Sequence, residues 1–532
     1  MRKKYLIACV LLFFQLLAVY FNFPDWFNFI LSFPIILIVC SRFYLNFLKH
    51  LKKFSIHPDG LISIGLILGF LNFQPIISIC AIIIAGLRDL ENYWLKKKLN
   101  ISSLSFSSET QIEKKVNMVF NYFSPTLLII LIIIVVFCYF SRNFNYIIMA
   151  IYILFSTSAR AFVFSANIPN ILTFSKFQKN NIYYNSAKTL EKIADLKYII
   201  FNYLGVLTEK KVKLLDIVAA DKNFALEIAA SLEKDNLHPH ALEILRYVES
   251  LGLSMKYTSH SNYIEDKGVI GRIGGKNYAL GNMNLMKDMG IVVGMLQREK
   301  IRLEKDGKIV LVLGSTAINL PNYQKNPGIV VALFVFENEL KKQGMNLISE
   351  LKKFKIIPWV ISSDSQFTLA QNLRKINIHN FEAELTIELK NEFIDKFSKI
   401  HHDTSIGIVK LNHEINSFSQ NNIFFNLESK QNTIGDNSIG FDDLDISKII
   451  FAIKQSKRLI TITKQNFYSS LLYNMSVIIF SFLSYDLFKN SSYIPIIAIL
   501  LSNICSMGII LNSKLQDDMV RAPGFEPGTT KV

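Results

Sequence analysis

Apolar residues are concentrated at the two ends of the chain, whereas the middle is polar and mixed. Eight apolar runs reach or approach the roughly 20 residues that a helix needs to cross a bilayer. They are about 5–23, 26–48, 59–73, 75–94, 122–141, 145–168, 467–488 and 492–512. The pattern predicts a polytopic α-helical membrane protein with one large insertion between the sixth and seventh spans.

Basic residues predict the orientation of these spans. Lysine and arginine cluster before the first span and after the second, fourth and sixth spans. Cytoplasmic loops carry an excess of these residues, so every cluster lies inside when both termini are cytoplasmic. We therefore expect an integral protein of a bacterial inner (plasma) membrane, with both termini and the large insertion in the cytoplasm.

The insertion alternates short strand-like runs with helical runs. The strand-like, β-branched runs are 199–201, 309–313, 330–336, 356–362 and 406–410, and the helical ones include 340–354 and 367–376. Strands that alternate with helices favour a parallel α/β sheet. A block at 216–325 separates the first strand from the rest, so we expect one domain inserted into another.

Composition changes this picture little. Hydrophobic residues make up 51% of the 532 residues, and the formal net charge is +16. Because 42 acidic residues are mixed among 58 basic ones, we expect a basic surface against the lipid bilayer and no nucleic-acid partner. The five cysteines lie in apolar segments and form no CxxC pair, which argues against a disulfide framework.

Six segments resemble, in their order and spacing, the motifs of one family. From about residue 30 to residue 515 the chain resembles the heavy-metal-translocating (class IB) P-type ATPases. FNYLGVLTEKK stands in the place of the phosphorylation motif DKTGTLT, SLEKDNLHPHALEIL in that of SEHPLAKAI, and GVIGRIGGKNYALGN in that of the glycine-containing strand that follows it. VISSDSQFTLAQNL stands in the place of the TGDN segment, AELTIELK in that of AELLPEDK, and KQNFYSSLLYN in that of the start of the next helix.

The resemblance implies a fold and a division into domains. The fold class is a polytopic α-helical membrane protein of about eight spans, with a cytoplasmic α/β HAD-like phosphorylation domain and an inserted α+β nucleotide-binding-like domain. The expected parts are 1–58 (two helices and a basic loop), 59–98 (a helix pair), 99–121 (a short linker), 122–168 (a helix pair), 169–215 with 326–458 (the phosphorylation domain), 216–325 (the nucleotide-binding-like domain), 459–513 (a helix pair) and 514–532 (a disordered tail).

The phosphorylation site of the family is altered in this chain. Asn202 stands in the place of the aspartate that attacks the terminal phosphate of ATP, and a neutral amide is a very poor nucleophile. Ser362 and Asp364 remain in the TGD-like turn, and Lys390 matches a lysine that in the family steadies phosphate charge. For Lys390, a solvated helix-start lysine is the simpler interpretation.

The magnesium and nucleotide sites are altered as well. His413 and Ser417 stand in the places of two magnesium-binding aspartates, and both are poor ligands for this hard cation. In the nucleotide domain His238 and Gly268 remain, whereas Asp266 replaces the first glycine of a pair, and its carboxylate would repel phosphate. The family resemblance implies ATP and Mg²⁺ as cofactors. Because the residues that bind them in the family are altered here, we expect this chain to retain neither.

The transport site lacks the cysteines that bind soft metal ions in the family. Ser156 and Ser158 replace them, or Ser158 and Arg160 if the alignment shifts by two residues. Arg160 in a metal pathway would oppose entry of a cation. Tyr473 and Asn474 match a metal-binding pair of relatives, but on their own they are better explained as residues that form hydrogen bonds between helices.

The actuator domain of the family is also missing, because the region between the fourth and fifth spans is far shorter than a domain. We therefore expect metal-translocating ATPase activity to be lost, and a non-catalytic membrane remnant or scaffold, with a membrane-protein partner of unknown identity. Two alternatives stay open: an active metal transporter with an atypical site, and a decaying gene product. The abrupt Pro- and Gly-containing tail 519–532 bears on the second alternative.

Overall fold

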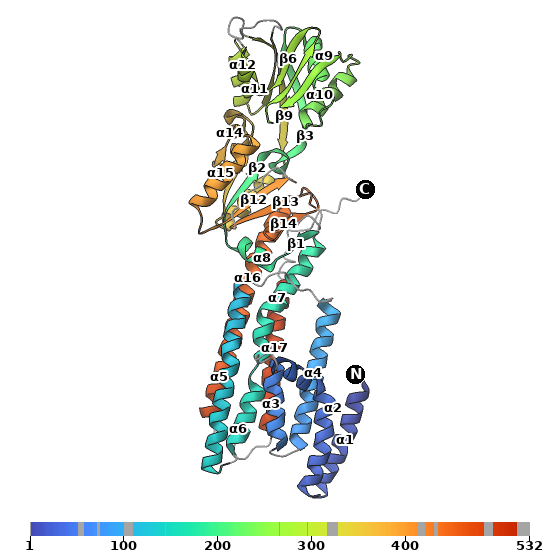
Figure 1. Ribbon diagram of the computed structural model, residues 1–532, viewed down its shortest axis with the longest axis vertical. Helices are drawn as coiled ribbons and strands as arrows, with labels where there is room; N and C mark the ends of the chain where they lie inside the picture. Colours follow the sequence, from blue (N-terminus) through green and yellow to red (C-terminus); the bar gives the residue numbers. More distant parts are fainter. Residues whose placement is uncertain are drawn as a thin grey trace. The chain divides into compact units, whose positions relative to one another are not determined.

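The protein forms two compact units in the computed structural model, which describes residues 2–51, 58–71, 75–99, 110–143, 145–264, 266–294, 296–316, 328–411, 421–429, 435–483 and 493–518 (Figure 1). Unit 1 comprises Met1–Lys179, Ser186–Glu191 and Gln455–Val532. Unit 2 comprises Asn180–Asn185 and Lys192–Lys454.

Unit 1 is built from apolar helices. They are α1 (Arg2–Tyr20), α2 (Asp25–Leu51), α3 (Pro58–Leu71), α4 (Pro75–Leu99), α5 (Gln111–Ser141), α6 (Asn145–Ser156), α7 (Ala159–Lys179), α16 (Ser447–Leu483) and α17 (Ile494–Asp518). Within the described residues, five helical segments are long and apolar enough to cross a membrane: Trp26–Lys49, Gln111–Ser141, Asn145–Lys179, Ser447–Leu483 and Ile494–Lys514. The two shorter ones are Lys4–Tyr20 and Gly60–Leu71. The protein is thus a helical membrane protein, and eight spans remain a prediction.

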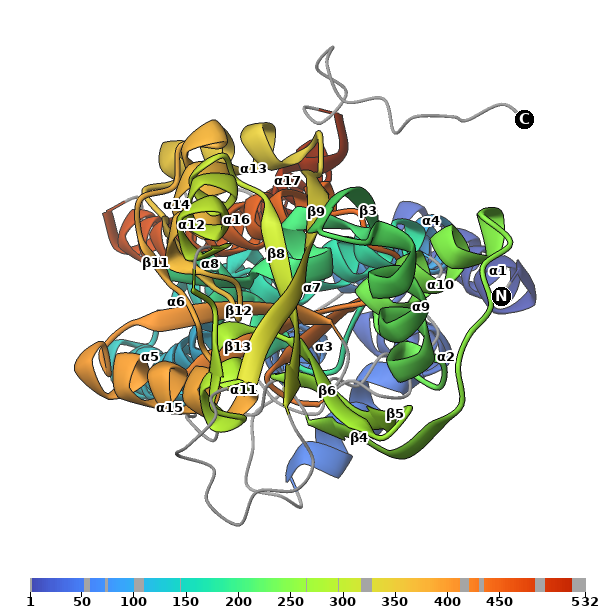
Figure 2. The same cartoon turned by 90° about the horizontal axis from the view of Figure 1, so that it is seen from above.

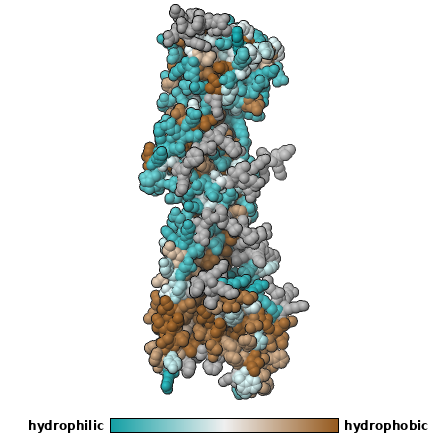
Figure 3. All heavy atoms as spheres, in the orientation of Figure 1, coloured by the Kyte–Doolittle hydropathy of each residue, from teal (hydrophilic) through white to brown (hydrophobic). Residues whose placement is uncertain are grey.

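Hydrophobic side chains cover much of the outer surface of these helices (Figure 3). Helix α5 illustrates the pattern. Its Leu127, Leu131 and Ile134 are buried against other helices, whereas Ile132 and Ile133 are 62% and 61% exposed. A helix that is apolar on its buried and exposed faces alike is typical of a membrane span.

One expectation for this unit is wrong in detail. The linker expected at 99–121 is helical from Gln111 onward, because Thr110 and Glu113 form a capping box that starts α5 there. Only residues 100–110 therefore separate α4 from α5. The span expected at 145–168 lies within the apolar segment Asn145–Lys179, and Thr157 and Ser158 interrupt its helix between α6 and α7.

Unit 2 contains a first sheet with strand order β1-β14-β13-β12-β2-β10-β11. Its strands are β1 (Ile182–Tyr184), β2 (Leu196–Asn202), β10 (Ile357–Ile361), β11 (Phe381–Glu382), β12 (Ser405–Leu411), β13 (Asn422–Leu427) and β14 (Ser438–Phe441). All neighbours are parallel except β1 and β14. The helices that accompany these strands in sequence are α8 (Ala187–Ala194), α13 (Gly344–Lys353), α14 (Gln366–Lys375) and α15 (Ile387–Ile400).

The connectivity of this sheet determines where a site can form. From β2 the chain goes to β10 and β11 on one side, and then to β12, β13 and β14 on the other side. Strand order therefore reverses at β2. In open parallel sheets, ligands bind outside the carboxyl ends of the strands at such a switch point. The carboxyl end of β2 is Asn202.

A second, mostly antiparallel sheet has the order β3-β9-β8-β6-β5-β4, with β7 paired to β9. Its strands are β3 (Thr208–Ala219), β4 (Thr258–Ile264), β5 (Gly268–Ile273), β6 (Lys276–Gly281), β7 (Ile291–Val292), β8 (Ile309–Thr316) and β9 (Gly328–Leu340). Helices α9 (Lys222–Glu233) and α10 (Pro239–Ser250) share one core with it, and α11 (Met283–Asp288) and α12 (Leu296–Lys305) share another. Figure 2 shows β3, β9 and β8 side by side.

The strands expected at 309–313 and 330–336 belong to this antiparallel sheet and not to the parallel one. They form parts of β8 and β9, which pair with each other. An apolar run of this kind shows that a strand is buried, but carries no information about its partners, which is why the expectation failed.

Candidate functional site

The first candidate site lies at the carboxyl end of β2. Asn202 is 4% exposed and lies next to Ile361 of β10 in the sheet register. The chain then turns through Tyr203–Leu207, where Gly205 has φ +71°, a conformation that favours glycine. A Cβ at Gly205 would come within 2.7 Å of the terminal Cδ1 of Leu411, a flexible side chain that can shift, so the positive φ is the stronger reason for glycine.

The residues that survive from the phosphorylation motif support this turn. The Thr208 hydroxyl oxygen accepts hydrogen bonds from the backbone N–H of Gly205 (3.0 Å) and from Nδ2 of Asn338 (3.0 Å). The buried Lys341 ammonium donates to the carbonyls of Gly205 (3.0 Å) and Leu444 (2.9 Å). Burial lowers the pKa of Lys341. These contacts give Gly205 and Thr208 a structural role that needs no ligand.

Ser362 and Asp364 lie in the turn after β10, beside this strand end. The Ser362 hydroxyl donates to Asp364 Oδ2 (2.9 Å) and accepts from the Asp364 backbone N–H (3.1 Å). Burial raises the pKa of Asp364, and the Ser362 bond and the charge of Lys390 oppose that rise. Lys390, in the first turn of α15, is 8% exposed and so is not the solvated lysine that the sequence favours. Asn202, Ser362, Asp364 and Lys390 thus share one edge of the sheet.

Tyr203 is a feature that the sequence analysis did not single out. Its side chain is fully buried. Burial, and then the charge of Asp364, raise the pKa of its hydroxyl. A buried aromatic ring therefore follows the strand end directly, at the second position of the altered motif. An aromatic residue directly after the strand end is the only signal in the sequence.

The donors described at this edge match a magnesium ion poorly, because Asp364 is the only carboxylate among the residues placed there. Mg²⁺ requires oxygen ligands in near-octahedral geometry, usually with one or two carboxylates. The described part of the chain holds no group of three or more His, Cys, Asp or Glu side chains that could bind a metal ion. Asn202 and Asn338 present neutral amides. His413 and Ser417, which follow β12, lie outside the described residues.

The second candidate site surrounds His238 at the start of α10. His238 is the N-cap residue of α10, and its Nδ1 lies 3.1 Å from Nδ1 of His240. The two rings stack, and His240 also meets the edge of Phe336. Burial, and then the neighbouring His238, lower the pKa of His240 to about 3. His240 is therefore neutral at physiological pH and acts as a core residue.

This burial predicts a pH dependence of stability. The unfolded chain protonates His240 near pH 6.5, whereas the folded chain does so only near pH 3. Between these values the unfolded state binds more protons, so stability falls as the pH falls. We expect His240 to reduce the free energy of unfolding by about 2 kcal/mol from pH 7 to pH 5. Urea unfolding of the full chain in detergent, followed by pulse proteolysis, measures it.

The variant His240→Leu should lose this part of the pH dependence. His260→Gln is the matched control, because it removes an exposed histidine of the same unit. Equal pH slopes for the wild type and His240→Leu would contradict the assignment.

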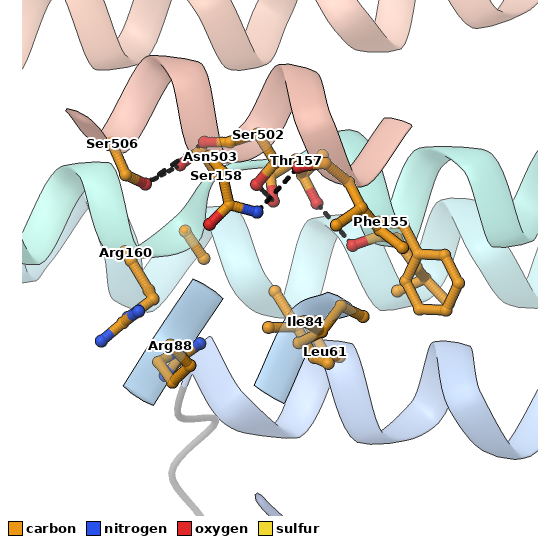
Figure 4. Close-up of a pocket in the computed structure, with 14 residues that line it drawn as sticks. Leu61, Ile84, Arg88, Phe155, Thr157, Ser158, Arg160, Ser502, Asn503 and Ser506 are labelled. Atoms are coloured by element: carbon orange, nitrogen blue, oxygen red, sulfur yellow. Dashed lines mark hydrogen bonds between the residues drawn. The ribbon is translucent and has the colours of Figure 1, made fainter. Parts of the chain in front are cut away.

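The third candidate site is the break between α6 and α7 in unit 1 (Figure 4). Asn474 of α16 accepts from the Ser158 backbone N–H (2.8 Å) through Oδ1, and its Nδ2 donates to the carbonyls of Ser470 (2.8 Å) and Ser158 (3.4 Å). Tyr473 donates to the Ser156 carbonyl (2.8 Å). The structure therefore brings together Ser156, Ser158, Tyr473 and Asn474. Tyr473 and Asn474 form hydrogen bonds with buried backbone groups at the break in the helix.

A small cavity of about 30 Å³ adjoins this break. That volume holds one or two water molecules. Its polar lining includes Ser158, Ser502, Asn503 and Ser506, and the hydroxyls of Ser158 and Ser506 bond to each other at 2.8 Å. Among the described residues, none that lines the cavity is a cysteine, histidine or methionine. These hard oxygen donors do not suit a soft metal ion as substrate. The thiol of Cys505 in α17 contacts Ser158 and is a soft donor next to this lining.

Arg160, in the first turn of α7, lines the same cavity and forms an ion pair with Glu91 of α4. Buried charges within membranes are usually paired in this way. The sequence offered one indication of this ion pair, which is that Glu91 is a carboxylate near the end of an apolar span. The sequence analysis did not single it out. Arg88 lines the cavity as well, so the expectation that a guanidinium here opposes entry of a cation stays a prediction.

Comparison with known proteins identifies the class to which these sites relate. No protein-family model matches the chain. It is 27% identical over 223 residues to a copper-exporting P-type ATPase of Legionella pneumophila, covering 42% of this chain and 29% of the relative. It is 23% identical over 388 residues to a probable copper-exporting P-type ATPase of Archaeoglobus fulgidus, covering 70% and 45%. The chain spans less than half the length of these relatives.

Solved structures show the same architecture. A crystal structure of a zinc-transporting PIB-type ATPase aligns with a TM-score of 0.58 at 12% identity, covering 96% of this chain and 99% of that one. A second crystal structure of a zinc-transporting PIB-type ATPase, in a different state, aligns with a TM-score of 0.53 at 11% identity, covering 96% and 98%. The predicted resemblance to heavy-metal P-type ATPases is confirmed, and the shared fold is that of the PIB type.

Proposed function

We propose that the protein is a non-catalytic member of this architecture, a membrane scaffold or partner subunit that neither forms a phosphoenzyme nor transports metal ions. The observation that supports this proposal most strongly is the asparagine at position 202. At the switch point of the parallel sheet, where the chemistry requires an ionised carboxylate, the chain presents a buried amide. An amide cannot form the acyl phosphate.

Two further features support the proposal. The break in the membrane helices is occupied by hydrogen bonds between oxygen and nitrogen groups, and neither Ser156 nor Ser158 is a cysteine, although the Cys505 thiol contacts Ser158. Residues 100–110, between α4 and α5, are also too few for an actuator domain, since domains rarely fall below about 50 residues. A transport cycle would need all three parts.

In this proposal the parallel sheet belongs to the expected phosphorylation domain (169–215 and 326–458), and most of the antiparallel sheet to the nucleotide-binding-like domain (216–325). The basic clusters support an inner-membrane location with both domains in the cytoplasm. The lipid bilayer is then one partner, and a membrane protein of unknown identity is the other.

The deciding experiment is phosphoenzyme formation from radiolabelled ATP in purified membranes, with Cu(I), with Zn²⁺ and without metal. We expect no acid-stable label above background, because Asn202 supplies no nucleophile. An active P-type ATPase in the same membranes is the positive control. Metal-dependent label on the chain would overturn the proposal and support the active-transporter alternative.

Accumulation in the cell separates a scaffold from a gene product in decay. A scaffold should be present in membranes at a steady level and should retain a defined partner after affinity purification. Absence of the intact chain from the membranes would favour the decaying gene product.

A further inference from the structure

The carboxylate of Asp266 contacts the amino end of α15. Its Oδ2 accepts a hydrogen bond of 2.6 Å from the backbone N–H of Ile387, the first residue of that helix. Asp266 precedes β5 of the antiparallel sheet, whereas α15 follows β11 of the parallel sheet. A residue of one sheet layer thus caps a helix of the other, and both belong to unit 2.

The amino end of α15 is a site that suits an anion. The first N–H groups of a helix have no partner within it, and its dipole favours negative charge there. The hydroxyl of the N-cap residue Thr386 accepts from Leu389 at 3.4 Å, a long bond that leaves room for a better acceptor. The cation of Lys390 lies one turn into the helix and is 8% exposed.

The segment that leads into α15 is attached to the candidate phosphorylation site. The backbone N–H of Glu384 donates to the Asp364 carbonyl (3.0 Å), and that of Leu385 donates to the Ser362 carbonyl (3.0 Å). An anion at the start of α15 therefore lies beside the residues that stand in the place of the phosphate-binding motif.

The turn that carries Asp266 is held by close backbone packing and a side-chain hydrogen bond. Asp266 has φ +60°, a conformation that aspartate tolerates better than most residues. Its carbonyl accepts from Nδ2 of Asn282 (2.7 Å). A Cβ at Gly268 would come within 2.2 Å of the Leu280 carbonyl oxygen, and one at Gly281 within 2.1 Å of the Lys267 carbonyl oxygen. Backbone packing therefore fixes where the carboxylate points.

A second set of contacts holds the same two layers together. The Thr368 hydroxyl of α14 donates to the Lys308 carbonyl (2.7 Å), and Nδ2 of Asn372 donates to the Gly307 carbonyl (3.0 Å). Gly307 has φ +82°, and a Cβ there would come within 2.8 Å of Asn372 Oδ1. The layers thus meet through direct contacts between protein groups.

We propose that Asp266 is a tethered anion, which fills the amino end of α15 and excludes phosphate-bearing ligands from it. The chain supplies by itself the negative charge that a phosphate group would otherwise bring between the two layers. This inference deepens the proposed function, on which it rests for the loss of phosphate chemistry. Asn202 and Asp266 are nevertheless tested separately, because the phosphoenzyme experiment reports on the nucleophile alone.

The test is hydrogen–deuterium exchange of the full chain in detergent, read on a peptide that covers the start of α15. In Asp266→Ala we expect the Ile387 amide to exchange about tenfold faster, since a hydrogen bond to a charged group is lost. Millimolar inorganic phosphate should slow this exchange in Asp266→Ala, because the vacated site accepts it, and should leave the wild type unchanged.

Two variants act as controls. Asp266→Asn retains an acceptor without the charge, keeps the turn, and should give an intermediate exchange rate. Asp288→Ala removes the carboxylate that pairs with Lys267 next to the same turn, and should leave the Ile387 amide as in the wild type. Unchanged exchange in both Asp266 variants, or equal protection by phosphate in the wild type, would overturn the inference.

Discussion

The Asn474→Leu variant is expected to lose about 2–3 kcal/mol of the free energy of unfolding of unit 1. Leucine is somewhat larger than asparagine and has no polar side-chain atoms, so it removes both the acceptor and the donor of the amide. The Ser158 N–H, which Asn474 Oδ1 accepts at 2.8 Å, is then left buried without that acceptor. In a membrane interior no bulk water replaces the lost bond.

Thermal unfolding of the detergent-purified chain, followed by size-exclusion chromatography, measures this loss. Asn503→Leu is the matched control, because Nδ2 of Asn503 donates to the Ile499 carbonyl of its own helix (2.8 Å) and not to the break. We expect Asn503→Leu to cost under about 1 kcal/mol. If the two variants unfold at the same temperature, Asn474 does not hold the break between α6 and α7.

The second prediction concerns Asn202→Asp, which restores the family residue at the strand end. We expect this variant to be less stable than the wild type and its phosphoenzyme level to stay at background. The donors described at this edge are a poor match for the Mg²⁺ that neutralises the transferred phosphate. Leu204 and Val206 also stand where the motif has threonines, and the Tyr203 ring is buried directly after the strand end.

The same variant should be less stable than the wild type by about 2 kcal/mol at pH 7. Position 202 is 4% exposed, so burial would raise the pKa of the new carboxyl above its unfolded value. The folded state then binds the proton more tightly, and the loss appears as the pH rises above about 4. Below that pH both states are protonated and the two proteins should be equally stable.

Urea unfolding at pH 4 and pH 7, with labelling by radiolabelled ATP at pH 7, tests both expectations on one preparation. Asn338→Asp is a useful companion, because it places a carboxylate next to Thr208 and leaves Asn202 unchanged. Label on Asn202→Asp alone would show that the site needs only its nucleophile, and that the remaining architecture is intact for catalysis.

Local patterns in the sequence determined the class of the protein. Runs of apolar residues, with lysine and arginine at their ends, are sufficient to predict membrane helices, because the bilayer imposes one length and one polarity on each span. The order of the motifs from Asn202 to Asn474 was sufficient for the resemblance to heavy-metal P-type ATPases, which the comparisons confirm. The identity of each altered residue was also legible, since the chemistry of an amide or a hydroxyl does not depend on the fold.

Contacts between distant residues were decided only by the tertiary structure. The break at Thr157 and Ser158 is supported by Asn474, 316 residues away from Ser158 in sequence, and no local pattern signals a helix that stops in the middle of a span. The pairing of Arg160 with Glu91 depends on the packing of α7 near α4.

Contacts within unit 2 were likewise decided only by the tertiary structure. The sheet to which β9 belongs depends on the pairing of its backbone, which an apolar run leaves open. The bond between Asp266 and Ile387 joins residues 121 apart and exists because two turns bring them together. Periodicity records how one segment meets its surroundings, whereas a hydrogen bond or an ion pair depends on two segments at once, and only the folded chain brings both into place.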